Sequence, residues 1–351
     1  MKKIFLIAIF GLQVFASDIV VTIKPLYSLV QSVLGDTQKA TLLLNKKESI
    51  HTFSIKPSHM RAINGAKVIF YIDEHLETFM ENAIEDKSIR AKKVSATEAK
   101  GVKLLAIRNN DNWEKHMHDE DEHHDEDGHH DEDGHHDEDE HHDEDEHHDE
   151  DEHHDEDGHH DEDEHHDEDG HHDDEEHHNE HDLHVWLDTK NAKAIVEQAV
   201  QVLSEYSSKD KKTYRANGDK IIAQIEKLEK ELKTRSKAIA NKPYIVFHDA
   251  YQYMENEWKL NAVGSIHIDP SLQISAKKIR NIRTKLDKFK VKCVLKEPQF
   301  LSQFDKTIAT IIQKRKINIG ILDPMGEHLG DVDFSYTQML RDNFSNLEKC
   351  L

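Results

Sequence analysis

Residues 210–240, DKKTYRANGDKIIAQIEKLEKELKTRSKAIA, separate two series of alternating strand and helix patterns. Within this stretch Ile221, Ile225, Leu228 and Leu232 recur at i, i+4, i+7 and i+11, and polar residues fill most of the remaining positions. This spacing places the four apolar side chains on one stripe of a helix. The stretch therefore predicts one long helix with a single buried face.

The flanking sequence favours α/β structure on both sides of this helix. Short β-branched runs that predict strands fall at 19–23, 40–44, 68–72 and 102–107 on one side, and at 244–247, 261–266, 291–295 and 317–322 on the other. Helical patterns fall at 26–34, 57–64, 76–84 and 191–205, and then at 275–289, 301–314 and 335–347. Such alternation is typical of βαβ units with parallel sheets. We predict two (β/α)-type lobes, 17–209 and 241–351, joined by the helix.

The run from His116 to Asp182 differs in composition from the rest of the chain. Ten His-His pairs recur every six residues, mostly separated by Asp-Glu-Asp-Gly or Asp-Glu-Asp-Glu, and the run holds 38 acidic residues and no Lys or Arg. Imidazole and carboxylate groups bind divalent transition metals, whereas a segment with almost no apolar residue cannot form a core. We expect 116–182 to be a disordered loop of the N-terminal lobe that captures zinc.

The same run accounts for the net charge of −25. Without it, 33 acidic residues stand against 46 basic ones, so the rest of the chain is mildly basic. This excess is spread over many residues and no nucleic-acid motif accompanies it. We therefore exclude a nucleic-acid-binding protein.

The first sixteen residues have the pattern of a cleaved secretory signal. Lys2-Lys3 precede an apolar stretch from Ile4 to Leu12, and Val14-Phe15-Ala16 form a small-residue cleavage site before Ser17. The apolar stretch is shorter than the ~20 residues that span a bilayer, and no Cys follows the cleavage point to accept a lipid. We expect a monomeric protein in the periplasm of a Gram-negative type of cell.

Export also bears on the two cysteines, Cys293 and Cys350. An oxidising compartment favours a disulfide between them, which would stabilise the fold by roughly 4 kcal/mol in the chain-entropy model. Two independent buried thiols remain the alternative. Zinc binding by the pair is disfavoured, because the sequence has no Cys-x-x-Cys spacing.

Three histidines outside the repeats fall where a ligand site is expected. His51 follows the predicted strand 40–44, His184 opens the segment after the acidic run, and His248 ends the strand Tyr-Ile-Val-Phe. Ligands of parallel α/β sheets bind beyond the carboxyl ends of the strands, so these three are candidate metal ligands. His267 also follows a strand and is a weaker candidate. The remaining polar candidates are expected to be solvated or local hydrogen-bond partners, namely His59, His75, Glu77 and His328.

Six short motifs carry a resemblance to a known family. They are His51-Thr-Phe-Ser-Ile-Lys-Pro57-Ser58, Asp73-Glu-His-Leu-Glu77-Thr-Phe, His184-Val-Trp-Leu-Asp188, Phe247-His248-Asp249-Ala250-Tyr251, Glu297-Pro298-Gln299-Phe300 and Leu322-Asp323-Pro324. Their order resembles that of zinc-specific periplasmic substrate-binding proteins of bacterial ABC transporters, the ZnuA family. The resemblance extends from about Asp18 to the C-terminus, without the acidic run. It implies two lobes joined by a rigid helix, with zinc bound in the cleft between them.

Carried onto this chain, the resemblance implies a specific ligand set. His51, His184 and His248 match the three metal histidines of the family, and Asp323 matches a carboxylate that completes the site in related proteins. Some zinc-binding members use water or another carboxylate instead, and here Ile50 precedes the first histidine, with Glu48 two positions further back. The fourth ligand is therefore Asp323, water or Glu48. Asp188 and Asp249 are candidates to orient the histidines, and the family's C-terminal disulfide matches Cys293 and Cys350.

These residues favour a zinc receptor over two other classes of protein. Three imidazoles and one oxygen suit Zn²⁺, whereas Mn²⁺ sites use more carboxylate and Ca²⁺ and Mg²⁺ prefer oxygen throughout. The resemblance implies a receptor that delivers Zn²⁺ to a membrane permease of an ABC transporter. The alternative is a zinc buffer or storage protein in which the acidic run is the functional element. A zinc hydrolase is disfavoured, because no general-base motif such as His-Glu-x-x-His is present.

Overall fold

The computed structural model describes residues 17–44, 48–108, 113, 181–267, 270, 274–329 and 335–351. The expected signal segment, residues 1–16, lies outside the described residues, as do residues 114–180, which hold most of the acidic run. Among the described residues, no helix combines the length and the hydrophobicity that a membrane span requires.

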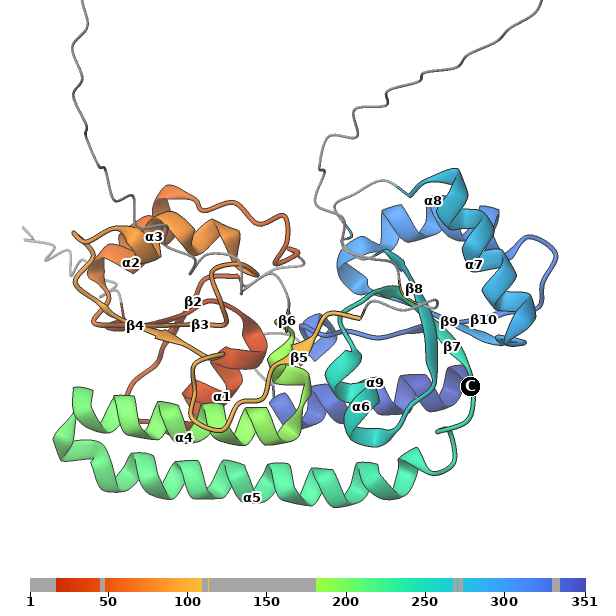
Figure 1. Cartoon of the computed structure of the whole chain (residues 1–351). Helices are drawn as coiled ribbons and strands as arrows, with labels where there is room; N and C mark the ends of the chain where they lie inside the picture. Colours follow the sequence, from red (N-terminus) through yellow and green to blue (C-terminus); the bar gives the residue numbers. More distant parts are fainter. Residues whose placement is uncertain are drawn as a thin grey trace, which may run out of the picture. The chain divides into compact units, whose positions relative to one another are not determined.

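The N-terminal lobe is built on a four-stranded parallel sheet in the order β2-β1-β3-β4 (Figure 1). Its strands are β1 (Ile19–Val21), β2 (Thr41–Leu42), β3 (Val68–Tyr71) and β4 (Lys92–Ser95), and the connecting helices are α1 (Lys24–Leu34), α2 (Pro57–Gly65) and α3 (Glu81–Glu85). β1 and β3 are buried along their whole length, as expected of central parallel strands covered on both faces. The short 3₁₀ turn η1 (Thr78–Met80) precedes α3.

The C-terminal lobe repeats this plan with the strand order β10-β9-β7-β8. Its strands are β7 (Tyr244–His248), β8 (Ala262–His267), β9 (Cys293–Lys296) and β10 (Asn318–Ile321). Its helices are α6 (Gln252–Trp258), α7 (Ala276–Lys288), α8 (Leu301–Ile312) and α9 (Tyr336–Cys350), with 3₁₀ turns η5 (Pro298–Phe300) and η6 (Glu327–Leu329). Both sheets are parallel throughout, which confirms the predicted fold class.

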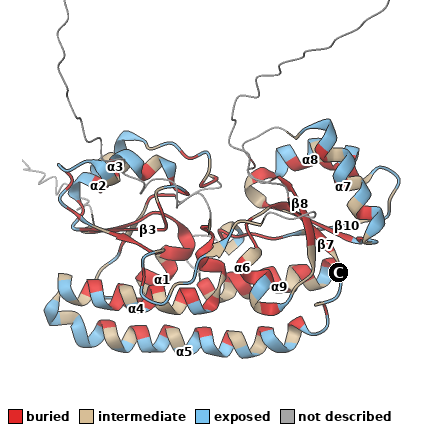
Figure 2. Cartoon of the chain, in the orientation of Figure 1, coloured by how far each residue is buried: buried red, intermediate tan, exposed pale blue. Residues whose placement is uncertain are grey.

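The predicted long helix is α5 (Lys211–Ser236), which follows α4 (Thr189–Tyr206) and the short turn η4 (Ser208–Asp210). The apolar stripe, Ile221, Ile225, Leu228 and Leu232, is buried as predicted. α5 packs against α1 and α4 of the N-terminal lobe and against α6 and α9 of the C-terminal lobe. Figure 2 shows its buried residues on the side that faces the other helices.

The predicted strand at 102–107 has a different role from the one we expected. Only β5 (Leu105–Ala106) is a strand there, and it pairs antiparallel with β6 (His181–Asp182) instead of joining the main sheet. The fourth strand of the sheet is β4. It begins with an exposed Lys92 and a partly exposed Lys93, so it lacks the apolar pattern that predicts a strand. Lysines on an edge strand oppose pairing with other chains, so the polar pattern suits the position.

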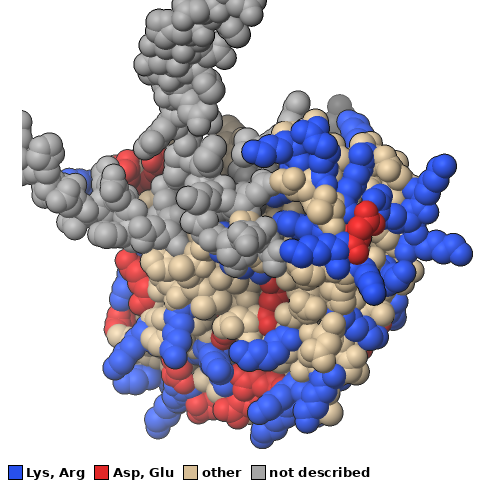
Figure 3. All heavy atoms as spheres, turned by 45° about the vertical axis from the view of Figure 1, so that its right-hand side comes forward, with Lys and Arg blue, Asp and Glu red and all other residues tan. Residues whose placement is uncertain are grey.

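The disulfide expected from the sequence joins Cys293 at the start of β9 to Cys350 at the end of α9, with a Cα–Cα distance of 5.4 Å. The pair links the sheet of the C-terminal lobe to the helix that packs on α5. Lys and Arg side chains greatly outnumber Asp and Glu on the face of this lobe that Figure 3 shows. Residues 276–316 alone contain thirteen Lys and Arg residues against three acidic ones, so much of the positive excess outside the acidic run is concentrated here and not spread along the chain as we expected.

Candidate metal centre

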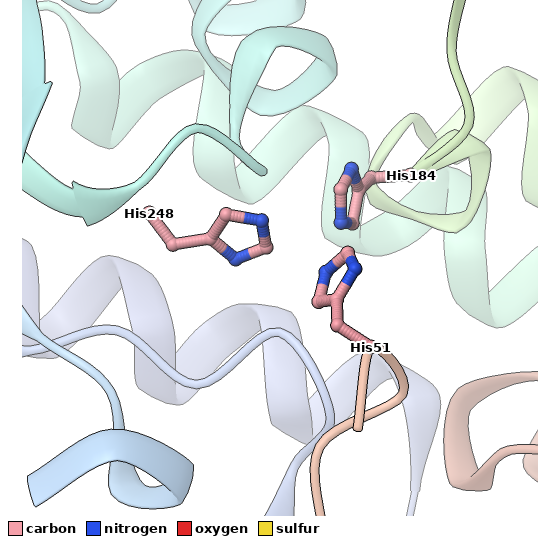
Figure 4. A group of neighbouring side chains, drawn as sticks. All are labelled: His51, His184 and His248. Atoms are coloured by element: carbon pink, nitrogen blue, oxygen red, sulfur yellow. The ribbon is translucent and has the colours of Figure 1, made fainter. Parts of the chain in front are cut away.

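Three histidines from distant parts of the chain converge on one point. His51 lies in the loop between β2 and α2, His184 follows β6, and His248 is the last residue of β7. One nitrogen of each ring lies within 4.8 Å of the corresponding nitrogens of the other two. The ring centroids are 4.8 Å apart for His51 and His248, 5.1 Å for His184 and His248, and 5.8 Å for His51 and His184. Figure 4 shows the three rings turned toward one another.

The secondary structure explains why these residues meet. β7 is buried along its length, and His248 stands at its carboxyl end, where parallel sheets bind ligands. The loop that carries His51 is folded by a turn at Ser49, whose Oγ accepts from the His51 backbone N–H at 3.2 Å and whose carbonyl accepts from Thr52. His184 is fixed by the strand pair β5–β6 immediately before it.

A carboxylate holds the ring of His184 in place. Its Nδ1 lies 2.8 Å from Oδ1 of Asp182, and the same oxygen accepts from the His184 backbone N–H at 2.9 Å. Donation from Nδ1 to a carboxylate leaves Nε2 as the atom with the free lone pair. This Nε2 is buried and has no hydrogen-bond partner among the described residues. A buried acceptor without a partner is costly, and a bound metal ion would satisfy it.

A buried carboxyl group lies behind His248. Oε1 of Glu297 is 3.5 Å from Nδ1 of His248 and accepts a hydrogen bond of 3.0 Å from the hydroxyl of Tyr251. Glu297 is only 2% exposed, and burial raises its pKa to about 8. At neutral pH the group is therefore largely a neutral acid beside the histidines. This 3.5 Å contact places Nδ1 of His248 beside Glu297, so Nε2 is the nitrogen that is available to a metal ion.

The histidines border a cavity of about 10 Å³, which is about the space that one water molecule or small ion needs. Ser49, Glu297 and Gln299 are polar neighbours in its wall. The rest of the wall is mainly apolar and comprises Ile50, Trp186, Phe300, Pro324 and Met325. Both lobes contribute to this wall, and the Trp186 indole N–H donates to the Pro324 carbonyl at 2.8 Å across it. Three imidazoles around a small, mostly apolar cavity are a donor set that suits Zn²⁺.

The structure does not bring Asp323 into the group of converging histidines. Asp323 follows β10, is fully buried, and accepts hydrogen bonds through both carboxylate oxygens. Burial alone would raise its pKa, but hydrogen bonds from His328 and Gln299 outweigh that effect and hold the pKa below its usual value. Glu48 is also outside the group, and its carboxylate forms an ion pair of 2.9 Å with Lys56.

The two carboxylates expected to orient the histidines have other partners. Asp188 caps α4, where its side chain accepts from the backbone N–H groups of Lys190 and Asn191. Asp249 is engaged by the guanidinium of Arg108, which also pairs with Glu255. The orienting carboxylate at His184 is Asp182, which sequence reasoning counted only as part of the acidic run. The Asp-x-His spacing of Asp182 and His184 was the feature of the sequence that could have identified this contact.

The weaker histidine candidates lie outside the group. His267 is 7% exposed, and its ring packs 4.8 Å from the ring of Phe247. His59 accepts from the Lys56 backbone N–H, His75 pairs with Asp73, and His328 pairs with Asp323 and Asp342. These local pairings confirm the expectation for His59, His75 and His328.

Comparisons with known proteins point to one family. Residues 19–350 match the family model described as "Zinc-uptake complex component A periplasmic". The chain is 37% identical to the high-affinity zinc uptake system protein ZnuA of Brucella abortus (strain 2308) over 95% of this chain and 91% of that protein. It is 33% identical to the protein of the same name from Haemophilus influenzae, over 95% and 93% of the two chains.

Solved structures share the fold. The periplasmic zinc binding protein TroA from Treponema pallidum superposes with a TM-score of 0.68 at 13% identity, covering 95% of this chain and 98% of that one. The AdcAII protein of Streptococcus pneumoniae superposes with a TM-score of 0.66 at 20% identity, covering 96% and 99%. At these identities the likeness concerns the two-lobed fold alone.

Proposed function

The chain belongs to the periplasmic zinc-uptake complex component A family, and we propose that it captures Zn²⁺ with His51, His184 and His248 and delivers it to the permease of an ABC transporter. Members of the family are receptors that bind zinc for transport and are not enzymes. The observation that carries the ligand assignment is the convergence of the three imidazoles on one small cavity.

The donor set supports zinc as the transported ion. Imidazole nitrogen is a borderline-soft ligand that Zn²⁺ binds in tetrahedral geometry, with a fourth position filled by water or a protein oxygen. The apolar wall formed by residues such as Trp186 and Phe300 lowers the local polarity and strengthens each metal–ligand contact. Ca²⁺ and Mg²⁺ require several oxygen ligands, which this group of side chains does not supply.

The three histidines leave the fourth position of a tetrahedral site to another ligand. Asp323 was the first candidate by resemblance, but its oxygens are occupied by hydrogen bonds, and Glu48 is paired with Lys56. A water molecule can fill the fourth coordination position without any rearrangement of the protein. We therefore propose three histidines and one water as the resting coordination.

We propose the acidic histidine-rich run as an accessory that captures zinc near the receptor site. The pairing of Ala106 with His181 places the C-terminal end of the run beside β5, which precedes the run in sequence, and His184 is only three residues after His181. Repeated His-His pairs supply weak metal sites, and protons compete with zinc for imidazole, so capture should weaken in mildly acidic medium. The run would then raise the supply of zinc to the cavity.

A zinc buffer or storage role would place the main binding capacity in the run. Deletion of residues 116–178 separates the two roles, because this deletion keeps β6 and Asp182. Zinc is titrated into the deletion variant against a chromophoric chelator. One tight site that survives the deletion supports the receptor, and loss of all tight binding would contradict it.

The proposal also includes export and a membrane partner. We propose that residues 1–16 are cleaved and that the mature protein is a monomer in the periplasm. N-terminal sequencing of the protein from a periplasmic extract should give Ser17, and light scattering should give the mass of one chain. A retained Met1 would contradict cleavage.

A further inference from the structure

We propose that His328 determines the metal preference of the centre by holding the Asp323 carboxylate in a closed set of hydrogen bonds, away from the ion. This inference rests on the three-histidine zinc site proposed above. His328 is a positioning residue here, because it acts on the metal only through Asp323. The fourth position is thereby left to water.

Asp323 is adjacent in sequence to residues that line the cavity. It lies just beyond the carboxyl end of β10, in the same parallel sheet in which His248 ends β7. The two residues that follow it, Pro324 and Met325, form part of the cavity wall. A carboxylate at this place would become a metal ligand after a small rearrangement, unless other groups held it.

Five donors hold the carboxylate. Oδ1 accepts from the Gly326 N–H at 2.9 Å, the Met325 N–H at 3.2 Å and Gln299 Nε2 at 3.2 Å, whereas Oδ2 accepts from His328 Nδ1 at 2.9 Å and the His328 N–H at 3.2 Å. A carboxylate has about four lone-pair sites, so these contacts saturate it. Coordination of a metal would require breaking buried hydrogen bonds to a charged group, which is costly.

His328 is itself held in place on its outer side. Its Nε2 lies 3.0 Å from Oδ2 of Asp342 in α9, and Oδ1 of Asp342 accepts from Gln338 at 2.8 Å. A carboxylate at each nitrogen favours the doubly protonated ring, which carries a positive charge. Hydrogen bonds to the two carboxylates raise the pKa of His328, which agrees with the charged form. The charge adds an attraction that keeps Asp323 on the side of His328.

Gln299 contacts Asp323 and also lines the cavity. Its Nε2 donates to Asp323, its side chain borders the cavity, and its Oε1 is buried without a hydrogen-bond partner among the described residues. An amide oxygen in this position can accept a hydrogen bond from a metal-bound water. The hydrogen bonds that run from His328 through Asp323 to Gln299 therefore end at an amide oxygen. This oxygen suits a water molecule at the fourth metal position.

This arrangement has a consequence for metal choice. Three imidazoles and a water suit Zn²⁺, whereas an added carboxylate moves the site toward the harder, oxygen-rich sets that bind Mn²⁺. Removal of the His328 ring leaves Oδ2 of Asp323 with one donor, the His328 backbone N–H at 3.2 Å, and should free this oxygen for the metal. The result should be a site with three nitrogens and a carboxylate, and a gain in Mn²⁺ affinity.

The test uses the variant lacking residues 116–178, with Co²⁺ as the spectroscopic probe and Mn²⁺ and Zn²⁺ affinities measured in parallel. In His328→Ala, the Co²⁺ absorption bands should shift and Mn²⁺ affinity should rise about tenfold or more. Asp323→Asn alone should keep the parent spectrum, and adding Asp323→Asn to His328→Ala should restore it. His75→Ala is the matched control, since His75 also pairs with an aspartate, Asp73, at 3.0 Å but lies outside the metal group.

An unchanged spectrum and Mn²⁺ affinity in His328→Ala would overturn the inference, and so would a Co²⁺ shift in Asp323→Asn alone. If His328→Ala does not fold, Asp342→Asn weakens the outer anchor of the same ring and should shift the spectrum in the same direction; an unchanged Asp342→Asn would then overturn the inference. Failure of the parent to bind Zn²⁺ or Co²⁺ would instead contradict the proposed function.

Discussion

The Nδ1 atom of His184 lies 2.8 Å from Oδ1 of Asp182, and this contact fixes which nitrogen of the ring faces the metal centre. A carboxylate behind a metal-binding histidine holds the ring orientation and raises its basicity. The backbone of Asp182 has its own support, because its carbonyl accepts from the Tyr253 hydroxyl at 2.6 Å. Replacement of the side chain should therefore change the ring and leave the strand in place.

We expect Asp182→Ala to weaken zinc binding by about 10-fold to 100-fold, measured in the variant lacking residues 116–178. Asp188→Ala is the matched control, since Asp188 is also close to His184 in sequence but caps α4. Its loss should cost about 1 kcal/mol of stability and leave zinc affinity unchanged. Parent-like zinc affinity in Asp182→Ala would show that the contact does not tune the site.

Each of the three converging histidines should be necessary for tight binding. We expect His51→Ala, His184→Ala and His248→Ala each to reduce zinc affinity by more than about 100-fold, because loss of a ligand exceeds the loss of a group behind it. His59→Ala tests for nonspecific effects of removing an imidazole, since His59 lies outside the group. Competition with a chelator of known affinity provides the measurement. A variant that binds zinc as tightly as the parent would remove that residue from the ligand set.

The sequence predicted most of the fold because apolar periodicity marks buried strands and helices. The stripe on α5 and the run Tyr-Ile-Val-Phe of β7 are buried, as their patterns require. The pattern failed at β4, where Lys92 and Lys93 belong to an edge strand that is only half buried. It also could not show that β5 pairs with β6, because a residue's strand partner depends on contacts between segments more than seventy residues apart.

The sequence predicted the site residues whose positions follow from strand ends. It predicted less well the contacts that depend on loops. His51 follows β2 and His248 ends β7, so their convergence could be expected, whereas His184 follows β6, a strand that the sequence pattern did not reveal. The hydrogen bonds around Asp323 come mainly from the turn after β10, including the backbone N–H groups of Met325 and Gly326, and no sequence pattern specifies them. A match by resemblance gives the position of a residue without giving its partners.

The disulfide between Cys293 and Cys350 should stabilise the fold without shaping the metal centre. The cysteines are 57 residues apart, and a cross-link of this span contributes roughly 4 kcal/mol in the chain-entropy model. Cys293 begins β9, whereas the histidines lie beyond the carboxyl ends of the strands. We expect the Cys293→Ser, Cys350→Ser double variant to unfold at lower urea concentration and to keep its zinc affinity when folded.

Reductant provides the control for this variant. Dithiothreitol should lower the urea midpoint of the parent to that of the double variant and should leave the double variant unchanged. Equal midpoints for the parent with and without reductant would show that the bond contributes nothing to stability.

Glu77 is buried, although its place in a helical pattern suggested a solvated face. It is fully inaccessible, its Oε2 accepts from the Ile72 backbone N–H at 2.6 Å, and burial raises its pKa to about 8. In the unfolded chain the carboxyl ionises near its ordinary pKa of 4.5, whereas in the folded protein it keeps its proton up to about pH 8. The folded state therefore binds more protons, so Glu77 makes stability fall as pH rises through this window.

We expect Glu77→Gln to remove this loss, because glutamine is a neutral mimic of the protonated acid. The variant should match the parent near pH 4.5 and exceed its free energy of unfolding by up to roughly 3 kcal/mol at pH 7. Urea unfolding between pH 4.5 and pH 8 measures the difference. The variant lacking residues 116–178 is the suitable background, because the histidines and carboxylates of the run titrate in the same range. Glu81→Gln, at an exposed position of α3, should leave the pH profile unchanged, and parallel profiles for Glu77→Gln and the parent would show that Glu77 is ionised in the folded protein.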